Sequence, residues 1–157
     1  MLYKDGPSNL LDRIRTLSEK TEDVSRFLVP AAGINACGSV RANATRVSYH
    51  DQCHLKKSLG IHKEPRILAR SNPDYEFSEM PGADRCCGMG GSFNLDQYAL
   101  SYGIGEEKVQ NIIASGSTTI ATSCPACMMQ LLDLVSKNNL PVSVKHVIEI
   151  YAESLKE

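Results

Sequence analysis

The sequence has 157 residues, with 17 basic and 18 acidic side chains and a formal net charge of −1. This length fits one domain that buries most of its unfolded surface, so disulfide bonds are not needed for stability. Charges of both signs are interspersed, which favours neither nucleic acid nor an anionic membrane as a partner. No apolar run is long enough to span a bilayer, and residues 1–6 lack the apolar core of a signal peptide. A reducing, cytoplasmic location is therefore expected.

Residues 1–44 are expected to form a helical lead-in and a linker. Between residues 8 and 29, apolar side chains recur at near-helical spacing, which predicts one or two helices ending at Pro30. Residues 30–44 are rich in Ala, Gly, Asn and Ser, a composition typical of a linker. One face of the 8–29 segment is expected to be uncovered in an isolated chain, where it would suit a homodimer.

Short strands and helices are predicted to alternate in a second unit, residues 45–157. Strands are expected at 46–50, 74–80, 118–122 and 141–144. Helices are expected at 65–69, 92–114, 125–137 and 146–155. The second of these helices is predicted to break near Gly103 and Gly105 and to stop at Gly116. The alternation is typical of an α/β fold, with a parallel sheet flanked by helices.

The six cysteines form a pattern that favours metal or redox chemistry over structural disulfides. They are Cys37, Cys53, Cys86, Cys87, Cys124 and Cys127. An adjacent pair combined with a Cys-x-x-Cys pair is unusual for a secreted disulfide scaffold. Cys53 and the Cys-x-x-Cys pair are expected where strands end and helices begin, and the adjacent pair on a glycine-rich turn. If the strands are parallel neighbours, five thiols meet at the carboxyl edge of the sheet, where helix N-termini stabilise thiolates.

Five thiols exceed the four ligands of tetrahedral zinc, and soft thiolate coordination suits an iron–sulfur cluster. A zinc-stabilised domain and a metal-free thiol–disulfide pair at Cys124 and Cys127 are the alternatives. Cys37 lies in the linker and is expected to be an ordinary free thiol. His50 and His54 flank Cys53. Histidine is a common zinc ligand, but packing at the strand end is favoured for His50, and capping or lining the site for His54.

Neighbouring glycines and cations have simpler interpretations. Gly88, Gly90 and Gly91 do not match a phosphate-binding loop, and are expected to let backbone N–H groups approach the sulfurs. Arg85 and Lys108 would either add positive charge near the metal or be solvated, and solvation is favoured for Lys108. Apolar stripes on the last two helices are expected to face the core; they are Leu131, Leu132, Val135, Ile148 and Tyr151.

Three segments carry a resemblance to a known family. They read Tyr-His-Asp-Gln-Cys-His-Leu at 49–55, Asp-Arg-Cys-Cys-Gly-Met-Gly-Gly-Ser-Phe at 84–93 and Ala-Thr-Ser-Cys-Pro-Ala-Cys at 121–127. From about Arg46 to Leu132 the chain resembles the cysteine-rich CCG domain. This domain occurs in heterodisulfide reductase and in iron–sulfur subunits of glycolate oxidase, lactate-utilisation and anaerobic glycerol-3-phosphate dehydrogenase complexes.

The resemblance implies a redox domain that binds a [4Fe-4S] cluster, non-cubane or cubane, with zinc as the alternative. The implied ligands are Cys53, Cys86, Cys87, Cys124 and Cys127. The domain would transfer electrons for a flavin-linked 2-hydroxyacid dehydrogenase of the glycolate or lactate type. Disulfide reduction at the cluster, as in heterodisulfide reductase, is the alternative activity, and a zinc-stabilised structural domain the alternative class.

The implied partners are a flavin dehydrogenase subunit and a second CCG copy or ferredoxin-like module of the same subunit. The chain resembles the C-terminal copy of such a subunit. Its expected location is cytoplasmic, peripheral to the membrane through partner subunits, without a membrane span of its own.

Overall fold

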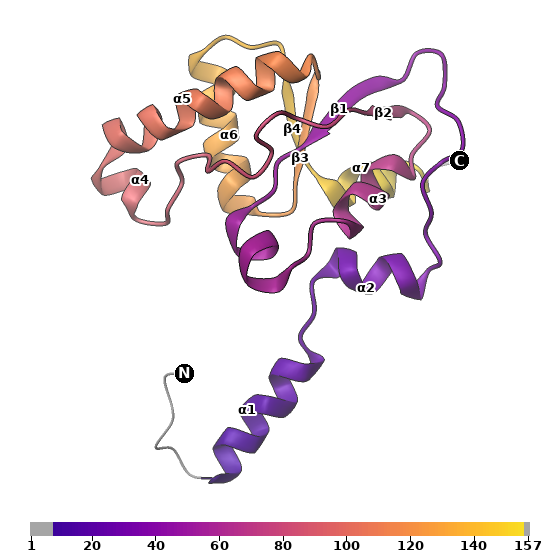
Figure 1. Cartoon of the computed structure of the whole chain (residues 1–157), viewed down its shortest axis with the longest axis vertical. Helices are drawn as coiled ribbons and strands as arrows, with labels where there is room; N and C mark the ends of the chain where they lie inside the picture. Colours follow the sequence, from indigo (N-terminus) through magenta and orange to yellow (C-terminus); the bar gives the residue numbers. More distant parts are fainter. Residues whose placement is uncertain (1–7, 156–157) are drawn as a thin grey trace.

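Four parallel strands form the centre of the fold, and helices flank them (Figure 1). The computed structural model describes residues 8–155, so the expectation for residues 1–6 lies outside the described part. The strands are β1 (Thr45–Tyr49), β2 (Tyr75–Phe77), β3 (Thr119–Thr122) and β4 (Ser143–His146). The helices are α1 (Ser8–Lys20), α2 (Val24–Ala31), the π-helix η1 (His54–Ser58), α3 (Glu64–Arg70), α4 (Phe93–Asp96), α5 (Tyr98–Ser115), α6 (Pro125–Lys137) and α7 (Val147–Glu153). The predicted α/β class, with a parallel sheet flanked by helices, is confirmed.

The strand order, β2-β1-β3-β4, creates a switch point in the middle of the sheet. After β1 the chain passes through α3 to β2 on one side, whereas after β3 it passes through α6 to β4 on the other. The two central strands pair in parallel, with Tyr49 opposite Ala121. In open α/β sheets, ligands bind outside the carboxyl ends of strands whose connections diverge in this way.

Each face of the sheet carries its own apolar core. On the face covered by α3 and α7, Val47 and Tyr49 of β1 pack with Leu68 and Ile150. On the opposite face, covered by α5 and α6, Ile120 of β3 packs with Leu131 and other buried residues. Ile120 and its neighbour Ala121 belong to different cores because successive strand residues point to opposite faces. The fold is therefore a three-layer α/β arrangement.

Three sequence-based details were wrong. The predicted helix break near Gly103 and Gly105 is absent: α5 runs through both glycines, and the interruption lies at Gln97. Gly105 allows close packing, since a Cβ there would lie 2.6 Å from a methyl of Leu134. The last strand begins two residues later than expected. Leu132, expected in the core, is exposed.

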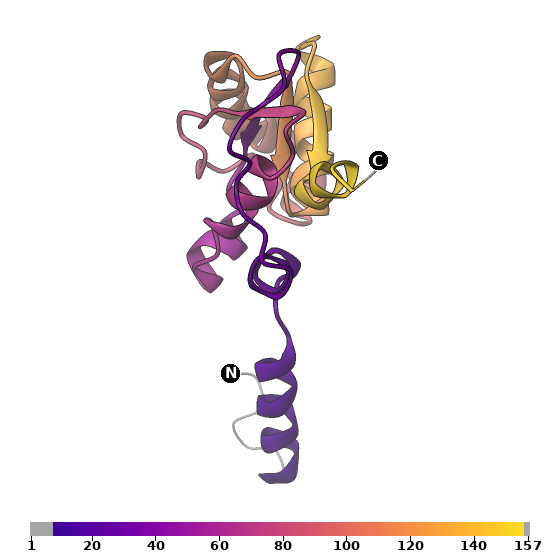
Figure 2. The same ribbon diagram turned by 90° about the vertical axis from the view of Figure 1, so that its right-hand side faces the viewer.

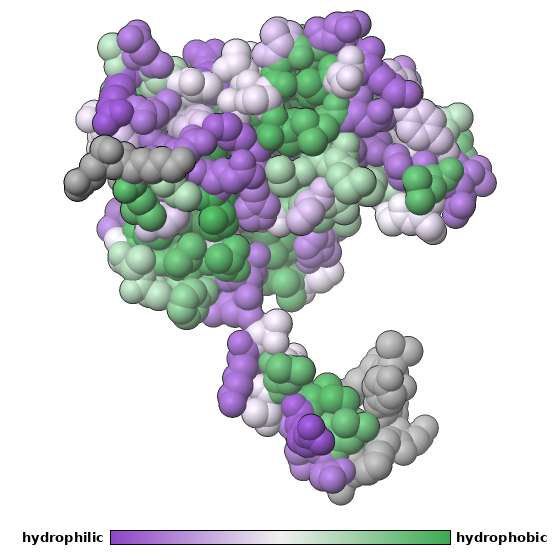
Figure 3. Space-filling model, turned by 180° about the vertical axis from the view of Figure 1, so that it is seen from behind, coloured by the Kyte–Doolittle hydropathy of each residue, from purple (hydrophilic) through white to green (hydrophobic). Residues whose placement is uncertain are grey.

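The N-terminal helices extend away from the sheet. In both Figure 1 and Figure 2, α1 projects from the body along the long axis, and α2 lies between it and α3. The apolar residues of α1 are half-buried or exposed, with Leu17 among the most exposed. Figure 3 shows this apolar surface on the projecting helix. Within the described residues this apolar side of α1 is thus uncovered, as expected, and dimerisation through it stays a prediction.

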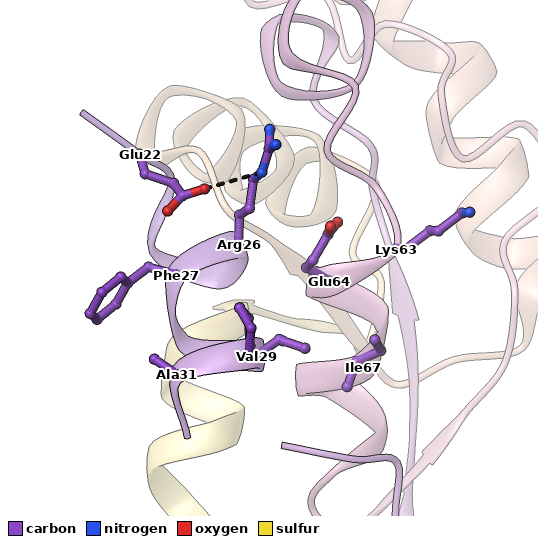
Figure 4. A pocket seen from close by; sticks show the side chains of 9 residues that line it. Glu22, Arg26, Phe27, Val29, Ala31, Lys63, Glu64 and Ile67 are labelled. Carbon is purple, nitrogen blue, oxygen red and sulfur yellow. Dashed lines mark ion pairs between the residues drawn. The ribbon is translucent and has the colours of Figure 1, made fainter. Parts of the chain in front are cut away.

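A large pocket of about 730 Å³ lies between α2 and α3 (Figure 4). Its lining residues are Glu22, Arg26, Phe27, Val29, Pro30, Ala31, Lys63, Glu64 and Ile67. At one side of it, Arg26 Nε pairs with Glu22 Oε1 at 3.1 Å. The lining includes neither a cysteine nor a histidine, so the thiol chemistry belongs elsewhere.

Among residues 8–155, no helix combines the length and apolar character that crossing a bilayer requires.

A matched pair of substitutions on α6 tests the core assignment. Leu131 is fully buried and Leu132 is 50% exposed. We expect Leu131→Ala to lower the free energy of unfolding by about 2–5 kcal/mol, because it leaves a cavity. Leu132→Ala should change it by about 0.5 kcal/mol or less. Urea denaturation measures both values, and similar losses in the two variants would contradict the assignment.

Candidate metal centre

The switch point brings two of the cysteine segments together. Cys53 follows β1 and immediately precedes the π-helix η1, whose Leu55 is buried. Cys124 follows β3 at the N-cap of α6, and Cys127 lies in that helix's first turn, after Pro125. Proline suits this first turn because its missing N–H would have no partner there. Each expected strand-to-helix position for these thiols is therefore observed.

The Cys86-Cys87 turn covers the same edge of the sheet. A small pocket of about 30 Å³ is lined by His50, Asp51, Cys53, Lys57, Asp84, Cys86, Cys87 and Cys127. Cys124 is half-buried and packs against the apolar cluster that contains Cys87 and Cys127. Cys53 and Cys86 are exposed, whereas Cys87 and Cys127 are buried. Four of the five expected thiols thus line one pocket, and Cys124 lies outside its lining, against the adjoining cluster.

His50, Cys87 and Cys127 offer ligand atoms that all lie within 4.8 Å of one another. Two thiolates bound to tetrahedral zinc lie about 3.8 Å apart, so this spacing approaches that of ligands around one ion. His50 is 1% exposed, and its Nδ1 has no hydrogen-bond partner. Burial, followed by the nearby charge of Lys108, lowers the pKa of His50 to about 3. Its imidazole is therefore neutral, which is the form that binds metal.

Neighbouring thiols favour the protonated forms of Cys86 and Cys87. A hydrogen bond with Cys127 is the main reason that the pKa of Cys87 rises to about 11. Likewise, a hydrogen bond with Cys87, then burial, raises the pKa of Cys86. The backbone N–H of Gly88 donates to Cys86 Sγ at 3.3 Å, as expected for this glycine. Metal ligation requires thiolates, so binding here must release protons.

A buried polar network fixes the turn that carries Cys86 and Cys87. Ser101 Oγ of α5 donates to the carbonyl of Gly88 at 2.8 Å. Asn94 Nδ2 donates to Ser101 Oγ at 3.0 Å and to Gln130 Oε1 at 2.6 Å. Gly88 itself has a φ of +96°, and a Cβ there would lie 2.2 Å from the Ser101 carbonyl oxygen. Only glycine fits at this position.

The segment between β1 and η1 is anchored by Asp51, which is 2% exposed. Its carboxylate accepts two hydrogen bonds from Arg66 of α3, at 2.7 and 2.9 Å, and one from Lys56 at 3.1 Å. Burial raises the pKa of Asp51, but the hydrogen bonds and charges of Arg66 and Lys56 outweigh it and hold the pKa below its usual range. The ion pairs thus fix the backbone on both sides of Gln52.

Hydrogen bonds also join the two segments that leave the sheet at the switch point. The buried Tyr49 hydroxyl donates to Gln52 Oε1 and shares a second hydrogen bond with Ser123 Oγ, both at 2.9 Å. Thr122 Oγ1 donates to the same Gln52 oxygen at 3.3 Å. These contacts hold Gln52, beside Cys53, and Ser123, beside Cys124, in fixed relative positions.

The two nearby cations differ from each other. The Arg85 side chain is 66% exposed and pairs with Glu107 at 3.3 Å. Of the two expectations for Arg85, solvation is therefore the one that the structure supports. Lys108, for which solvation was favoured, is instead fully buried, and that expectation was wrong. The local pattern contains no signal for its burial, because charged residues precede it at 106 and 107.

The remaining expected residues do not line the pocket. Cys37 is exposed in the segment before β1, where its thiol donates to the Ser39 carbonyl at 2.8 Å. His54 is exposed and does not line the pocket. Sequence reasoning missed the supporting side chains of Ser101 and Gln130, which belong to helical patterns without any site signal.

Two glycine substitutions separate steric conflict from backbone strain. Gly88→Ala should lower the free energy of unfolding by at least about 2 kcal/mol, because positive φ and a backbone clash act together. Gly91 has a φ of +64° but open space around it, so Gly91→Ala should cost about 1 kcal/mol. Chemical denaturation measures the difference. Equal losses would show that the turn does not contact α5 as described.

The Asp51 ion pair gives a pH dependence. A carboxylate with a lowered folded pKa contributes its full stability above its unfolded pKa of about 4, and loses it as pH falls through the folded pKa. Asp51→Asn should therefore lower the free energy of unfolding by about 3 kcal/mol at pH 7. The difference from the wild type should shrink below about pH 4. Denaturation at pH 7 and pH 3 tests this, with exposed Asp12→Asn as the control expected to change neither value.

The chain matches a known family over the region that contains these cysteines. The profile of the family described as CCG, cysteine-rich domain, matches residues 47–132, which is more than half of the chain. The matched region contains Cys53, the adjacent pair and the Cys-x-x-Cys pair, and excludes Cys37.

Curated relatives extend the likeness over most of the chain. Lactate utilization protein A of Bacillus subtilis (strain 168) is 28% identical over 149 residues, covering 95% of this chain and 61% of that protein. Lactate utilization protein A of Bacillus pumilus (strain SAFR-032) is 30% identical over 135 residues, covering 85% of this chain and 56% of that protein. The chain spans about 60% of the length of the curated relatives it matches. By the profile match and the cysteine pattern within it, the chain belongs to the cysteine-rich CCG domain family.

Proposed function

We propose that Cys53, Cys86, Cys87, Cys124 and Cys127 hold a metal centre, and that the centre is a [4Fe-4S] cluster. The observation that carries the proposal is that Cys53, Cys86, Cys87 and Cys127 line one pocket, with Cys124 packed against the adjoining cluster. The donor set suits the group, because several converging cysteine thiolates are the usual ligands of iron–sulfur clusters. His50 adds a buried nitrogen without a partner on the same site.

When bound, such a cluster supplies one-electron transfer. The chain's own residues would bind it, limit its contact with water and adjust its potential. Gly88 supplies a hydrogen bond to Cys86 Sγ, and hydrogen bonds to ligand sulfurs are one factor that sets cluster potentials. The buried thiols Cys87 and Cys127 would form the shielded side of the centre, and Cys53 and Cys86 the exposed side.

We further propose that the protein is an electron-transfer domain of an iron–sulfur oxidoreductase subunit. The relatives named lactate utilization protein A support a role in lactate-type metabolism. By resemblance to the family, the partner would be a flavin-linked 2-hydroxyacid dehydrogenase of the lactate or glycolate type. A second CCG copy or a ferredoxin-like module would be the next carrier. In this proposal residues 45–157 form the cluster domain, residues 1–44 the connection to a neighbouring module, and the cytoplasm is the location.

A zinc-stabilised structural domain is the second candidate. It is favoured by the spacing of His50, Cys87 and Cys127, which approaches that of ligands around one ion. Zinc has no redox chemistry, so this candidate would contribute only stability. It uses four ligands at most, and therefore leaves at least one of the five thiols dispensable.

Metal analysis of anaerobically reconstituted protein distinguishes the two candidates. We expect about four iron and four acid-labile sulfide per chain, with an EPR signal that changes on reduction. Single Cys→Ser substitutions at the five positions should each lower the iron content at least twofold, whereas the control Cys37→Ser should not. Zinc at about one per chain, without sulfide after reconstitution, would contradict the cluster and support the structural candidate.

A further inference from the structure

Lys108 is a buried cation at the base of the cysteine turn. It lies in α5 with no exposed surface, and its Nζ donates to the carbonyls of Gly82 at 2.7 Å and Ala83 at 3.2 Å. Met80 Sδ lies 4.0 Å away on the apolar side. Burying an ammonium group is costly unless a counter-charge compensates it.

No carboxylate provides that counter-charge within the described part of the chain. Lys108 has no ion pair among residues 8–155. Asp51 and Asp84 act on it only at longer range, and both are already paired, Asp51 with Arg66 and Lys56, and Asp84 with Lys56. The positive charge thus has no acidic partner in contact.

The two carbonyls do not explain the lysine either. Ala83 O also accepts the backbone N–H of Asp51 at 3.0 Å, and Gly82 O accepts that of Arg85 at 2.9 Å. Both acceptors would keep a partner if the ammonium were removed. A neutral side chain of similar length would therefore leave no buried carbonyl unsatisfied.

The thiols are the remaining source of negative charge. Met80 and Ala83, both in contact with Lys108 Nζ, pack in the same buried cluster as Cys87 and Cys127. A dipositive ion or cluster core bound by more than two thiolates carries a net negative charge. Such a centre supplies the compensation that the metal-free protein lacks.

We propose that Lys108 is the internal counter-charge of the metal centre, a positioning residue whose buried ammonium stabilises the ionised, metal-bound thiolates. This inference rests on the proposed metal centre. It predicts effects of opposite sign: the charge costs stability in the metal-free protein and adds stability in the loaded protein. If Lys108 served only as a backbone clasp, that is, only to hold Gly82 and Ala83 through its hydrogen bonds, it would stabilise both the metal-free and the loaded protein.

The test compares Lys108→Met with the matched control Arg85→Met, which removes an exposed cation next to Cys86. Thermal unfolding is measured for each protein, metal-free and Zn²⁺-loaded, and Zn²⁺ affinity by competition with a chelator. Metal-free Lys108→Met should be at least as stable as the wild type, while its Zn²⁺ affinity should fall at least tenfold. The Zn²⁺ affinity of Arg85→Met should stay within about twofold of the wild-type value, because solvent screens an exposed charge.

After iron and sulfide reconstitution, the same variants give a redox readout. At a fixed potential the ratio of reduced to oxidised cluster should fall at least tenfold in Lys108→Met, which is about 59 mV for a one-electron couple. Arg85→Met should again change little. This readout is independent of turnover by any partner enzyme.

Each outcome separates the two proposals. A wild-type protein that takes up neither Zn²⁺ nor iron and sulfide would contradict the proposed metal centre itself. Normal uptake by the wild type with unchanged affinity and redox ratio in Lys108→Met would overturn only the counter-charge. A Lys108→Met protein that is destabilised or unfolded without metal would also overturn it, because the backbone-clasp role predicts that result.

Discussion

Adjacent parallel strands β1 and β3, whose connections leave in opposite directions, are the constraint on which the site depends. Their divergence opens the carboxyl edge of the sheet, and the chain sets Cys53 beyond one strand and Cys124 beyond the other. The Tyr49 hydroxyl, bonded to Gln52 and Ser123, fixes these two exits relative to each other. The thiols therefore gather because of backbone topology, with no disulfide required among them.

Two buried groups near the thiols lack a partner that their chemistry calls for among residues 8–155. His50 is buried and neutral, with one ring nitrogen unbonded, and Lys108 is buried without an acidic partner among the described residues. Asp51, by contrast, is fully compensated by Arg66 and Lys56. The charge of Asp51 is thus compensated, whereas the charge of Lys108 is not. In the proposed metal centre, anionic thiolates would supply the missing negative charge.

Much of this architecture is predictable from sequence because it rests on local signals. The alternation of strands and helices predicts the α/β fold. Pro125 and Gly116 mark the start of α6 and the end of α5, because each residue constrains its own backbone. The failures depend on distant contacts. Gly105 permits packing against Leu134 instead of breaking a helix, and Lys108 is bonded to the carbonyls of Gly82 and Ala83, which lie 26 and 25 residues before it. Neither contact produces a periodic pattern in the sequence.

The most direct test of the central claim, that the gathered thiols ligate metal, is X-ray absorption at the iron edge of the reconstituted protein. The account predicts a first coordination shell dominated by sulfur, together with iron–iron scattering from a cluster. A shell of light oxygen and nitrogen atoms, without sulfur or a second iron, would contradict it, because iron would then be bound outside the cysteine site.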